Sequence, residues 1–418
     1  MSDQVGVYCF LNSVFGSPSQ AEFWASVEEP GYEPADRLVA RDMHRIVGHA
    51  QVLFRACSLG PLPLPTAQVD WLSVTPKLQG QGLGTRLARA AESHMVRRGS
   101  MVGWARAPTS SFFAKLGWAN CGRNRWSRGD AHHVLGSLME QGLHQPGRRE
   151  KVHIRPWLAW EVDRLPGLYR ATMAGLLGPV ERSEAYWQWL MHRQAFDQFY
   201  VAVDGPELID LDGRKSPVVG YAAIKAGQIL ELAAASGRRG IAASLLARVC
   251  HEGIESGRRT VLLHAPKADR LHDVFRCSGG PCRVDSPHYD DAVMAKVLQP
   301  LALLRRMKNL LLPRAIAAGL PPRFELGFQV GEKHYLLAVA KSDLTVLGRK
   351  PTRHSIELNR ADFTRMLLGQ LDWERVLADG PMVARTAEAA CFARVLFPTV
   401  PFWKPPLDDL KRDDANPY

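Results

Sequence analysis

The chain has no run of about 18 apolar residues, and its first residues lack the basic and then apolar layout of a secretory signal peptide. Its seven cysteines are an odd number, and no C-x-x-C spacing occurs. No histidine cluster accompanies the closest cysteine pair, Cys277 and Cys282. These absences argue against a membrane span, a disulfide framework and a zinc site. We therefore expect a cytoplasmic protein with reduced thiols and no bound metal.

Length and charge limit the class of protein further. A chain of 418 residues with 46% apolar residues predicts two or three folded domains. The formal net charge is +11, but the basic residues come in short clusters such as Arg97-Arg98 and Arg238-Arg239. Because no long basic run with interleaved aromatic residues occurs, the pattern argues against nucleic-acid binding. A basic entrance would also serve a polyanionic small molecule.

Residues 69–85 carry the most informative local pattern. Their first half is an apolar run that predicts a buried strand ending at Pro76. Apolar residues at helical spacing follow and predict a helix. Between the two, Gly80, Gly82 and Gly84 permit tight backbone conformations and leave amide groups at a helix start, which attracts anions. The segment therefore predicts a phosphate-binding strand, loop and helix.

The spacing of these glycines decides between known phosphate loops. It does not fit the dinucleotide pattern G-x-G-x-x-G, and no Gly-Lys-Ser/Thr of a P-loop follows. The stretch Gln79-Gly-Gln-Gly-Leu-Gly84 instead resembles the Gln/Arg-x-x-Gly-x-Gly/Ala loop of the GNAT acetyltransferases. Downstream, Ser111-Phe-Phe-Ala-Lys-Leu-Gly-Trp118 is similar to the late helix and strand of that family. The alternative is a purely structural strand, turn and helix.

The resemblance implies an N-acetyltransferase that moves an acetyl group from acetyl-CoA directly to a primary amine, either a small molecule or a lysine-type side chain. It places the pantetheine and thioester along Leu72, Ser73 and Val74. It assigns the remaining coenzyme contacts to Gly80, Gln81, Gly82, Leu83, Gly84, Thr85, Pro108 and Thr109. The alternative function is a weak or inactive binding protein for an apolar or CoA-linked ligand.

The residue that protonates the departing thiolate is in doubt. The family's tyrosine aligns with Phe113, which has no proton to donate. Water or a nearby hydroxyl of Thr109, Ser110 or Ser111 would have to replace it, or the thiolate would leave unassisted, or the enzyme would be inactive. A thiol pKa of about 8.5 makes unassisted departure tolerable.

The general base is equally open. The resemblance implies a terminal carboxylate on an aromatic residue, which here is Tyr418, although residues 411–418 form an extra polar tail. Asp70, on the same predicted strand as the thioester-lining residues, is an alternative. His132 and His133 are further alternatives, although a lone histidine is more often structural.

Three successive units resemble the enhanced-intracellular-survival acetyltransferases. These units are an N-terminal GNAT domain (1–138), a degenerate second GNAT-like domain (152–298) and a sterol-carrier-protein-like domain (299–418). The sequences that carry the resemblance are Arg182 to Leu190, Leu367 to Gly369 and Leu396 to Trp403. It implies two tandem mixed-sheet α/β domains and then an α+β domain. We also expect a homo-oligomer, because the C-terminal unit must dock somewhere.

The second unit repeats the first in weaker form. Val218-Val-Gly-Tyr-Ala parallels Ile46-Val-Gly-His-Ala, but the spaced glycines of the loop have no counterpart. We therefore predict that the second unit shares the fold of the first without binding coenzyme A. Residues 60–65, rich in glycine and proline, predict a loop in the first unit, and residues 141–151 predict a linker between the units.

Overall fold

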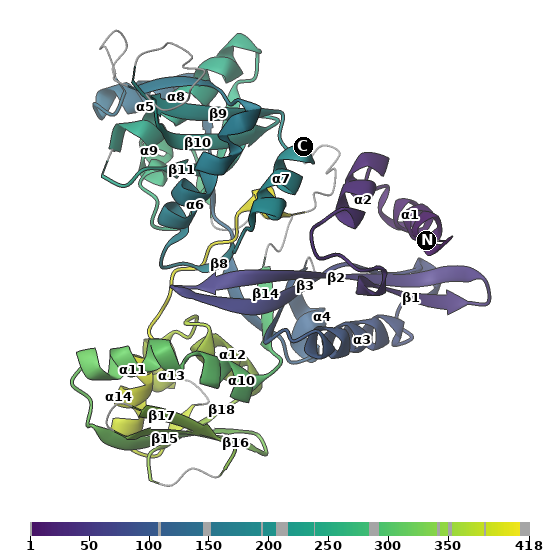
Figure 1. Cartoon of the computed structure of the whole chain (residues 1–418), viewed down its shortest axis with the longest axis vertical. Coiled ribbons are helices and arrows are strands. Elements are labelled where there is room, and N and C mark those ends of the chain that lie inside the picture. Colours follow the sequence, from purple (N-terminus) through teal and green to yellow (C-terminus); the bar gives the residue numbers. More distant parts are fainter. Residues whose placement is uncertain are drawn as a thin grey trace.

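The computed structural model describes residues 2–107, 110–144, 152–193, 195–205, 216–237, 239–283, 292–340, 343–349, 353–379 and 382–409. Three sheets, each with its own helices, form three lobes (Figure 1). This arrangement confirms the expected mixture of α/β and α+β units. Among the described helices, none is both long and apolar enough to cross a membrane.

The first sheet has the strand order β1-β2-β3-β4-β14-β5, and β8 pairs with β2 outside this path. Its strands are β1 (Arg37–Asp42), β2 (Arg45–Leu59), β3 (Leu62–Val74), β4 (Val102–Ala107), β5 (Ala119–Arg123), β8 (Leu177–Val180) and β14 (Ala292–Val297). Its helices are α1 (Ser2–Phe15), α2 (Gln20–Val27), α3 (Leu83–Arg97) and α4 (Ser110–Lys115).

Helix α3 is amphipathic and covers one face of this sheet. Leu87, Ala91 and Met95 are buried, at the spacing that places them on one side of a helix. Gly48 on β2 allows the close approach of the helix, because a Cβ there would lie 2.9 Å from the Leu87 side chain. The predicted strand, loop and helix are thus present.

The predicted loop at residues 60–65 is wrong. Only a short turn separates β2 from β3, which already begins at Leu62 and pairs Pro63 with Ser58 and Pro65 with Ala56. The two prolines lie at alternate positions of the strand, so they face the same way, and the neighbouring strand accommodates both. The glycine and proline content of residues 60–65 therefore predicted a longer interruption between the two strands than the structure has.

The second sheet has the order β13-β6-β12-β11-β10-β9-β7. Its strands are β6 (Trp126–Asp130), β7 (Val152–Pro156), β9 (Gln198–Asp204), β10 (Val218–Lys225), β11 (Gln228–Ala234), β12 (Thr260–His264) and β13 (Cys282–Arg283). Its helices are α5 (Ala131–Glu140), α6 (Leu165–Met173), α7 (Glu184–His192), α8 (Arg239–Glu255) and α9 (Leu271–Cys277).

The second sheet repeats a detail of the first. Gly220 pairs with Ala234 at the end of β11, as Gly48 pairs with Val74 at the end of β3. A Cβ at Gly220 would lie 2.7 Å from Ile241 of α8, so the helix after the loop again packs closely on a glycine. The two sheets therefore share this packing device.

Three strands lie in the sheet of the other sequence unit, and one of them is β8, which pairs with β2 of the first sheet. β6 pairs with β12 and β13 of the second sheet, whereas β14 pairs with β4 and β5 of the first. Each of these two sheets therefore contains strands from both of the expected domains, 1–138 and 152–298. The bounds of those domains stay a prediction from the sequence. Of the expected linker, only residues 141–144 are described.

The third sheet has the order β17-β16-β15-β18-β19. Its strands are β15 (Arg323–Val330), β16 (Lys333–Ala340), β17 (Asp343–Leu347), β18 (Ser355–Leu358) and β19 (Val383–Ala384). The helices of this lobe are α10 (Pro300–Arg306), α11 (Lys308–Ala317), α12 (Arg360–Leu367), α13 (Trp373–Asp379) and α14 (Ala387–Leu396). Its hydrophobic core continues into the first sheet through Trp104 and Val293.

After α14 the chain leaves the third lobe and runs back between the other two (yellow in Figure 1). Phe402 forms a parallel bridge with Leu177 of β8, and a Cβ at Gly122 would lie 2.3 Å from the Phe402 ring. Residues 403–409, which we term the return segment, are buried between the first and second lobes. Sequences from all three units therefore meet there.

Candidate active site

The glycine loop follows β3 directly. Gly80 and Gly82 have φ values of +76° and +82°, in the region that favours glycine, and Gly82 is the N-cap of α3. The side-chain amide of Gln79 donates to the carbonyl of Val74 at 3.1 Å and holds the loop against the strand end. A Cβ at either glycine would meet nothing within 4 Å, so open space lies beside the loop.

The start of α3 presents free backbone donors. Its first helical hydrogen bond runs from the Arg86 N–H to the Gly82 carbonyl, at 3.1 Å. The N–H groups of Leu83, Gly84 and Thr85 precede this bond, so the helix itself provides no acceptor for them. Together with the helix dipole, these groups form an anion-binding position.

Beside the loop, β3 and β4 separate. Their parallel pairing extends from Thr66↔Val102 to Val69↔Ala105, after which β3 continues to Val74 with β2 as its only strand partner among the described strands. A wedge therefore opens between the ends of the two strands. It lies next to the start of α3, because the loop connects this end of β3 to the helix.

The separation begins at a backbone irregularity. Trp71 has a φ of +48°, which is costly for a bulky residue, and the register of β3 against β2 shifts at the same point. The Trp71 indole is 3% exposed and packs with Phe10 and Leu11 of α1 and Phe23 of α2. Burial of this ring under the two N-terminal helices offsets the cost.

The backbone of β3 directs donors into the wedge. The Thr75 N–H donates to the Val47 carbonyl on the β2 side, at 2.9 Å. Successive residues of a strand point their N–H groups to opposite sides. The N–H groups of Leu72 and Val74 therefore point toward β4, where no neighbouring strand receives them. Donors in this position can polarise a carbonyl group.

A row of polar side chains crosses the sheet at the mouth of the wedge. Arg37 on β1 pairs with Gln51 on β2, and Gln51 pairs with Asp70 on β3, so the three side chains share one face. The face opposite α3 thus carries an arginine, an amide and a half-buried carboxylate. We term these residues the polar row. The Asp70 carboxylate also accepts from the Trp71 N–H at 2.9 Å.

Several buried polar atoms of this region have no hydrogen-bond partner. They are both amide atoms of Gln51, Nε2 of His49, and Nε and Nη1 of Arg37. Burial, followed by the Arg37 charge, lowers the pKa of His49 to about 3, so its ring is neutral. Unpaired buried polar atoms are costly and mark positions where a ligand or water supplies the missing partner.

The return segment adds charged groups to the face of the first sheet that carries the polar row. Asp409 forms an ion pair with Arg106 of β4, at 2.5 Å, and Lys404 donates to the side chain of Gln68 on β3. Burial lowers the pKa of Lys404. Sequence reasoning missed Arg106, Asp409 and Lys404, because only the folded chain brings residues 404–409 to the first sheet.

The aromatic pair on α4 occupies two environments. Phe113 is 6% exposed, and its ring packs edge-on against Trp118 with centroids 5.1 Å apart. Phe112 is half-buried and lies near the loop, since a Cβ on Gly84 would be 3.7 Å from its ring. Phe113 is therefore largely buried against Trp118, whereas Phe112 lies beside the helix start.

The other predicted site residues divide into two groups. Pro108, Thr109 and Tyr418 lie outside the described residues. His132 and His133 lie on α5, which packs on α8 and α9 of the second lobe, so the structure does not bring them to the loop. Within the described ranges, no group of three metal-binding side chains is close enough to hold a metal ion.

Comparisons with known proteins agree with this geometry. Residues 2–121 match the model of the acetyltransferase (GNAT) domain. A GCN5-related N-acetyltransferase from Kribbella flavida shares the fold with 16% identity over 96% of this chain and 95% of that chain, at a TM-score of 0.69. Eis1 from Mycobacterium abscessus shares it with 16% identity over 96% of both chains, at a TM-score of 0.64. No curated protein matches the sequence.

A probable N-acyltransferase from Enterococcus faecalis also has the same fold, with 10% identity over 96% of both chains and a TM-score of 0.71. At these identities the solved structures show a common fold over nearly the whole chain. The domain match covers α1 to β5, which includes the glycine loop and the wedge. Residues 2–121 therefore form a GNAT acetyltransferase domain, and the protein is an acyltransferase.

Proposed function

We propose that this protein transfers an acetyl group from acetyl-CoA directly to a primary amine, within a complex that holds both substrates. One observation carries the proposal: free amides at the start of α3 lie beside a wedge whose mouth is lined by unpaired buried polar atoms. The first feature suits a polyphosphate and the second suits a polar acceptor.

Acetyl-CoA would lie along the wedge, in contact with two sets of backbone amides. The amides of Leu83 to Thr85 hold the pyrophosphate, and the N–H groups of Leu72 and Val74 face the thioester carbonyl. As the amine nitrogen attacks, the carbonyl oxygen gains charge and these donors stabilise it. The carbon–sulfur bond then breaks, and the sulfur leaves as a thiolate.

Two protons must leave the amine nitrogen: a base takes one from the incoming ammonium group before the attack, and water takes the other as the carbon–sulfur bond breaks. Asp70 is our first candidate, because it belongs to the polar row and lies on the strand that carries the polarising amides. Asp409, ion-paired with Arg106 on the same face, is the second candidate. Both carboxylates also attract a cationic amine. Phe113 supplies no acid, so we expect the thiolate to leave without a side-chain donor.

The test measures binding and chemistry separately. Acetyl-CoA is titrated by calorimetry, and free thiol release is then followed with a panel of small amines and lysine peptides. The variant Asp70→Asn should lower kcat by about 10² or more, the usual contribution of a general base, without changing coenzyme affinity. Asp42→Asn, at the exposed end of β1, is the matched control. Normal turnover by Asp70→Asn would remove Asp70 from the mechanism.

The alternative is a binding protein for an apolar or CoA-linked ligand. Tight acetyl-CoA binding with no thiol release on any amine would favour it. Our proposal also retains a sterol-carrier-like third lobe, a homo-oligomer and a cytoplasmic location. Sedimentation of the full chain tests the oligomer directly.

A further inference from the structure

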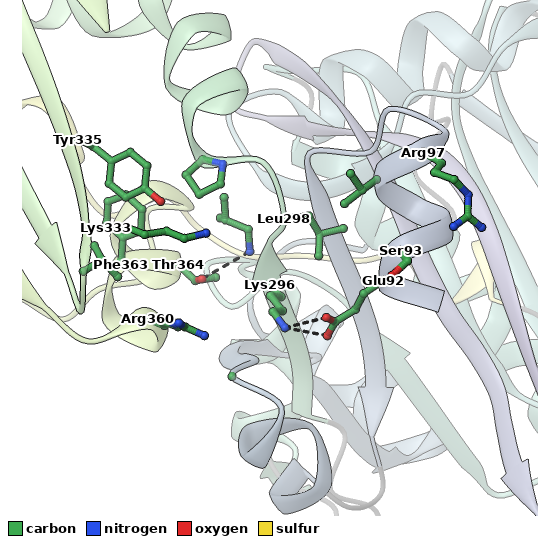
Figure 2. A pocket seen from close by; sticks show the side chains of 15 residues that line it. Glu92, Ser93, Arg97, Lys296, Leu298, Lys333, Tyr335, Arg360, Phe363 and Thr364 are labelled. Atoms are coloured by element: carbon green, nitrogen blue, oxygen red, sulfur yellow. Dashed lines mark hydrogen bonds and ion pairs between the residues drawn. The ribbon is translucent and has the colours of Figure 1, made fainter. Parts of the chain in front are cut away.

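A second hollow lies on the seam between the first and third lobes. Its volume is about 470 Å³, within the usual range for small-molecule sites. One wall comes from the second half of α3 and from β14, and the other from β15, β16 and α12 (Figure 2). We term it the seam cavity.

The floor of the seam cavity is apolar and mostly buried, since Tyr335 is 6% and Phe363 3% exposed. The rings of Tyr335 and Phe363 stack nearly parallel, with centroids 5.2 Å apart and an angle of 13° between their planes. Leu298 and Val330 also line the cavity. Such a floor suits an alkyl or aryl group.

The charges around the cavity are unbalanced. The only carboxylate of the lining residues, Glu92, is already neutralised by Lys296, whose Nζ lies 2.8 Å from both of its oxygens. Lys333 and Arg360 line the cavity from the third lobe and form no ion pair within the described part of the chain. In Figure 2 both extend toward the wall that carries Lys296 and Leu298.

The cavity is separate from the coenzyme position. The glycine loop precedes Leu83, at the start of α3, whereas Glu92 and Ser93 lie in the second half of the same helix. At about 1.5 Å per residue, the two positions are roughly 14 Å or more apart along the axis. The cavity therefore calls for a ligand other than the pyrophosphate.

We propose that the seam cavity binds an amphipathic carboxylate, such as a medium-chain fatty acid, with its head on Lys333 and Arg360 and its tail on the Tyr335 and Phe363 rings. A neutral apolar ligand would leave both exposed cations without a counter-charge. A small inorganic anion would leave the apolar side chains of the lining that are not fully buried, Val96, Leu298 and Pro300, in contact with water. Only a ligand with both parts satisfies both surfaces.

The test uses octanoate as the probe, titrated into the full chain by calorimetry. 1-Octanol has the same tail without the charge, and acetate has the head without the tail. We expect one octanoate per chain, bound at least about tenfold more tightly than either control compound. Equal binding of 1-octanol, or no octanoate binding at millimolar concentration, would overturn the proposal.

Two variants locate the site. Lys333→Gln/Arg360→Gln should weaken octanoate binding about tenfold or more, because both charge-assisted contacts are lost. The control Arg375→Gln/Arg394→Gln removes the same charge from exposed positions of the third lobe that do not line the cavity. An equal loss of octanoate affinity in both double variants would show that only the net charge matters, and it would refute the proposed site.

A third variant separates shape from charge. Ser93 is exposed at the α3 wall, so Ser93→Trp should fill the cavity while every cation stays in place. We expect octanoate binding to fall with acetyl-CoA affinity unchanged. Full octanoate binding by Ser93→Trp would place the ligand elsewhere and contradict the proposal.

Discussion

Arg182 and Asp408 meet where both side chains are completely buried, with Nε 2.9 Å from Oδ1. The same guanidinium holds both oxygens of Glu231 on β11, at 2.8 and 2.5 Å. The Tyr186 hydroxyl donates to Asp408 at 3.2 Å, and Arg55 of β2 donates to its backbone carbonyl at 2.7 Å. This cluster locks the return segment between the first and second lobes.

Removing the shared cation should be severe. Arg182→Ala leaves two carboxylates buried without their counter-charge, so we expect a loss of about 3–5 kcal/mol in the free energy of unfolding. Urea denaturation measures it. The control is Arg155→Ala. The ion pair of Arg155 with Glu161 is partly exposed on the arginine side, so this variant should lose less stability. Equal losses of stability in the two variants would show that the buried cluster contributes no more than a partly exposed ion pair.

The glycine loop can be tested with a pair of matched variants. Gly82→Glu places a charge and a side chain where the pyrophosphate would lie, so acetyl-CoA binding should become undetectable. Gly99→Glu adds the same residue beyond the other end of α3, at a φ of +84° and in equally open space. We expect Gly99→Glu to bind normally, as calorimetry will measure. Normal affinity in Gly82→Glu would contradict the coenzyme assignment.

The second lobe should bind no coenzyme, which gives one acetyl-CoA per chain. It repeats the packing of Gly48 at Gly220, but it has no spaced glycine loop. In this lobe the Glu231 carboxylate already accepts hydrogen bonds from the Arg182 guanidinium, at 2.8 Å, and from the Tyr221 hydroxyl, at 2.7 Å. Calorimetric stoichiometry decides the matter, and a value of two would refute the prediction.

Restoring the family's tyrosine should speed the reaction. Phe113→Tyr adds a proton donor, for which we expect a gain in kcat at or below the lower end of the usual 10²–10⁴ range, with little change in coenzyme affinity. Phe112→Tyr, beside the helix start, is the control. Because Phe113 is nearly buried, a hydroxyl that faces the core would instead destabilise the fold by about 1–3 kcal/mol. Lower stability without faster turnover would contradict the assignment.

His49 should make stability depend on pH. Its folded pKa of about 3 lies below the ordinary value of about 6.5, so its contribution is complete above pH 6.5 and is lost as the pH falls toward 3. The slope is at most about 1.4 kcal/mol per pH unit. In urea denaturation from pH 7 to 4, His49→Gln should lose this component, whereas His132→Gln, at an exposed position, should not. Parallel curves for wild type and His49→Gln would contradict it.

The sequence predicts the strand, glycine loop and helix well because their signal is local. Gly80, Gly82 and the apolar spacing of α3 lie within one strand–loop–helix. The fold class and the repeat at Gly48 and Gly220 also follow from such patterns. Residue spacing can reveal these features because each depends on neighbours along the chain.

Other parts of the site depend on contacts between distant residues. Nothing near Trp71 in the sequence signals a positive φ, since the burial of its ring requires α1 and α2. Arg106 meets Asp409 only after the return segment has crossed from the third lobe. The position of Phe113 in the motif is local information, but its burial against Trp118 is not.

The exchange of β14 has a consequence for biosynthesis. This strand lies between β4 and β5, yet it is translated long after β5 ends at Arg123. At about 5–20 residues per second, the ribosome needs roughly ten to thirty seconds to deliver it. During that interval the edges of β4 and β5 have no partner and are open to pairing with other chains. The first sheet can therefore be completed only after the strands of the second sheet have been translated.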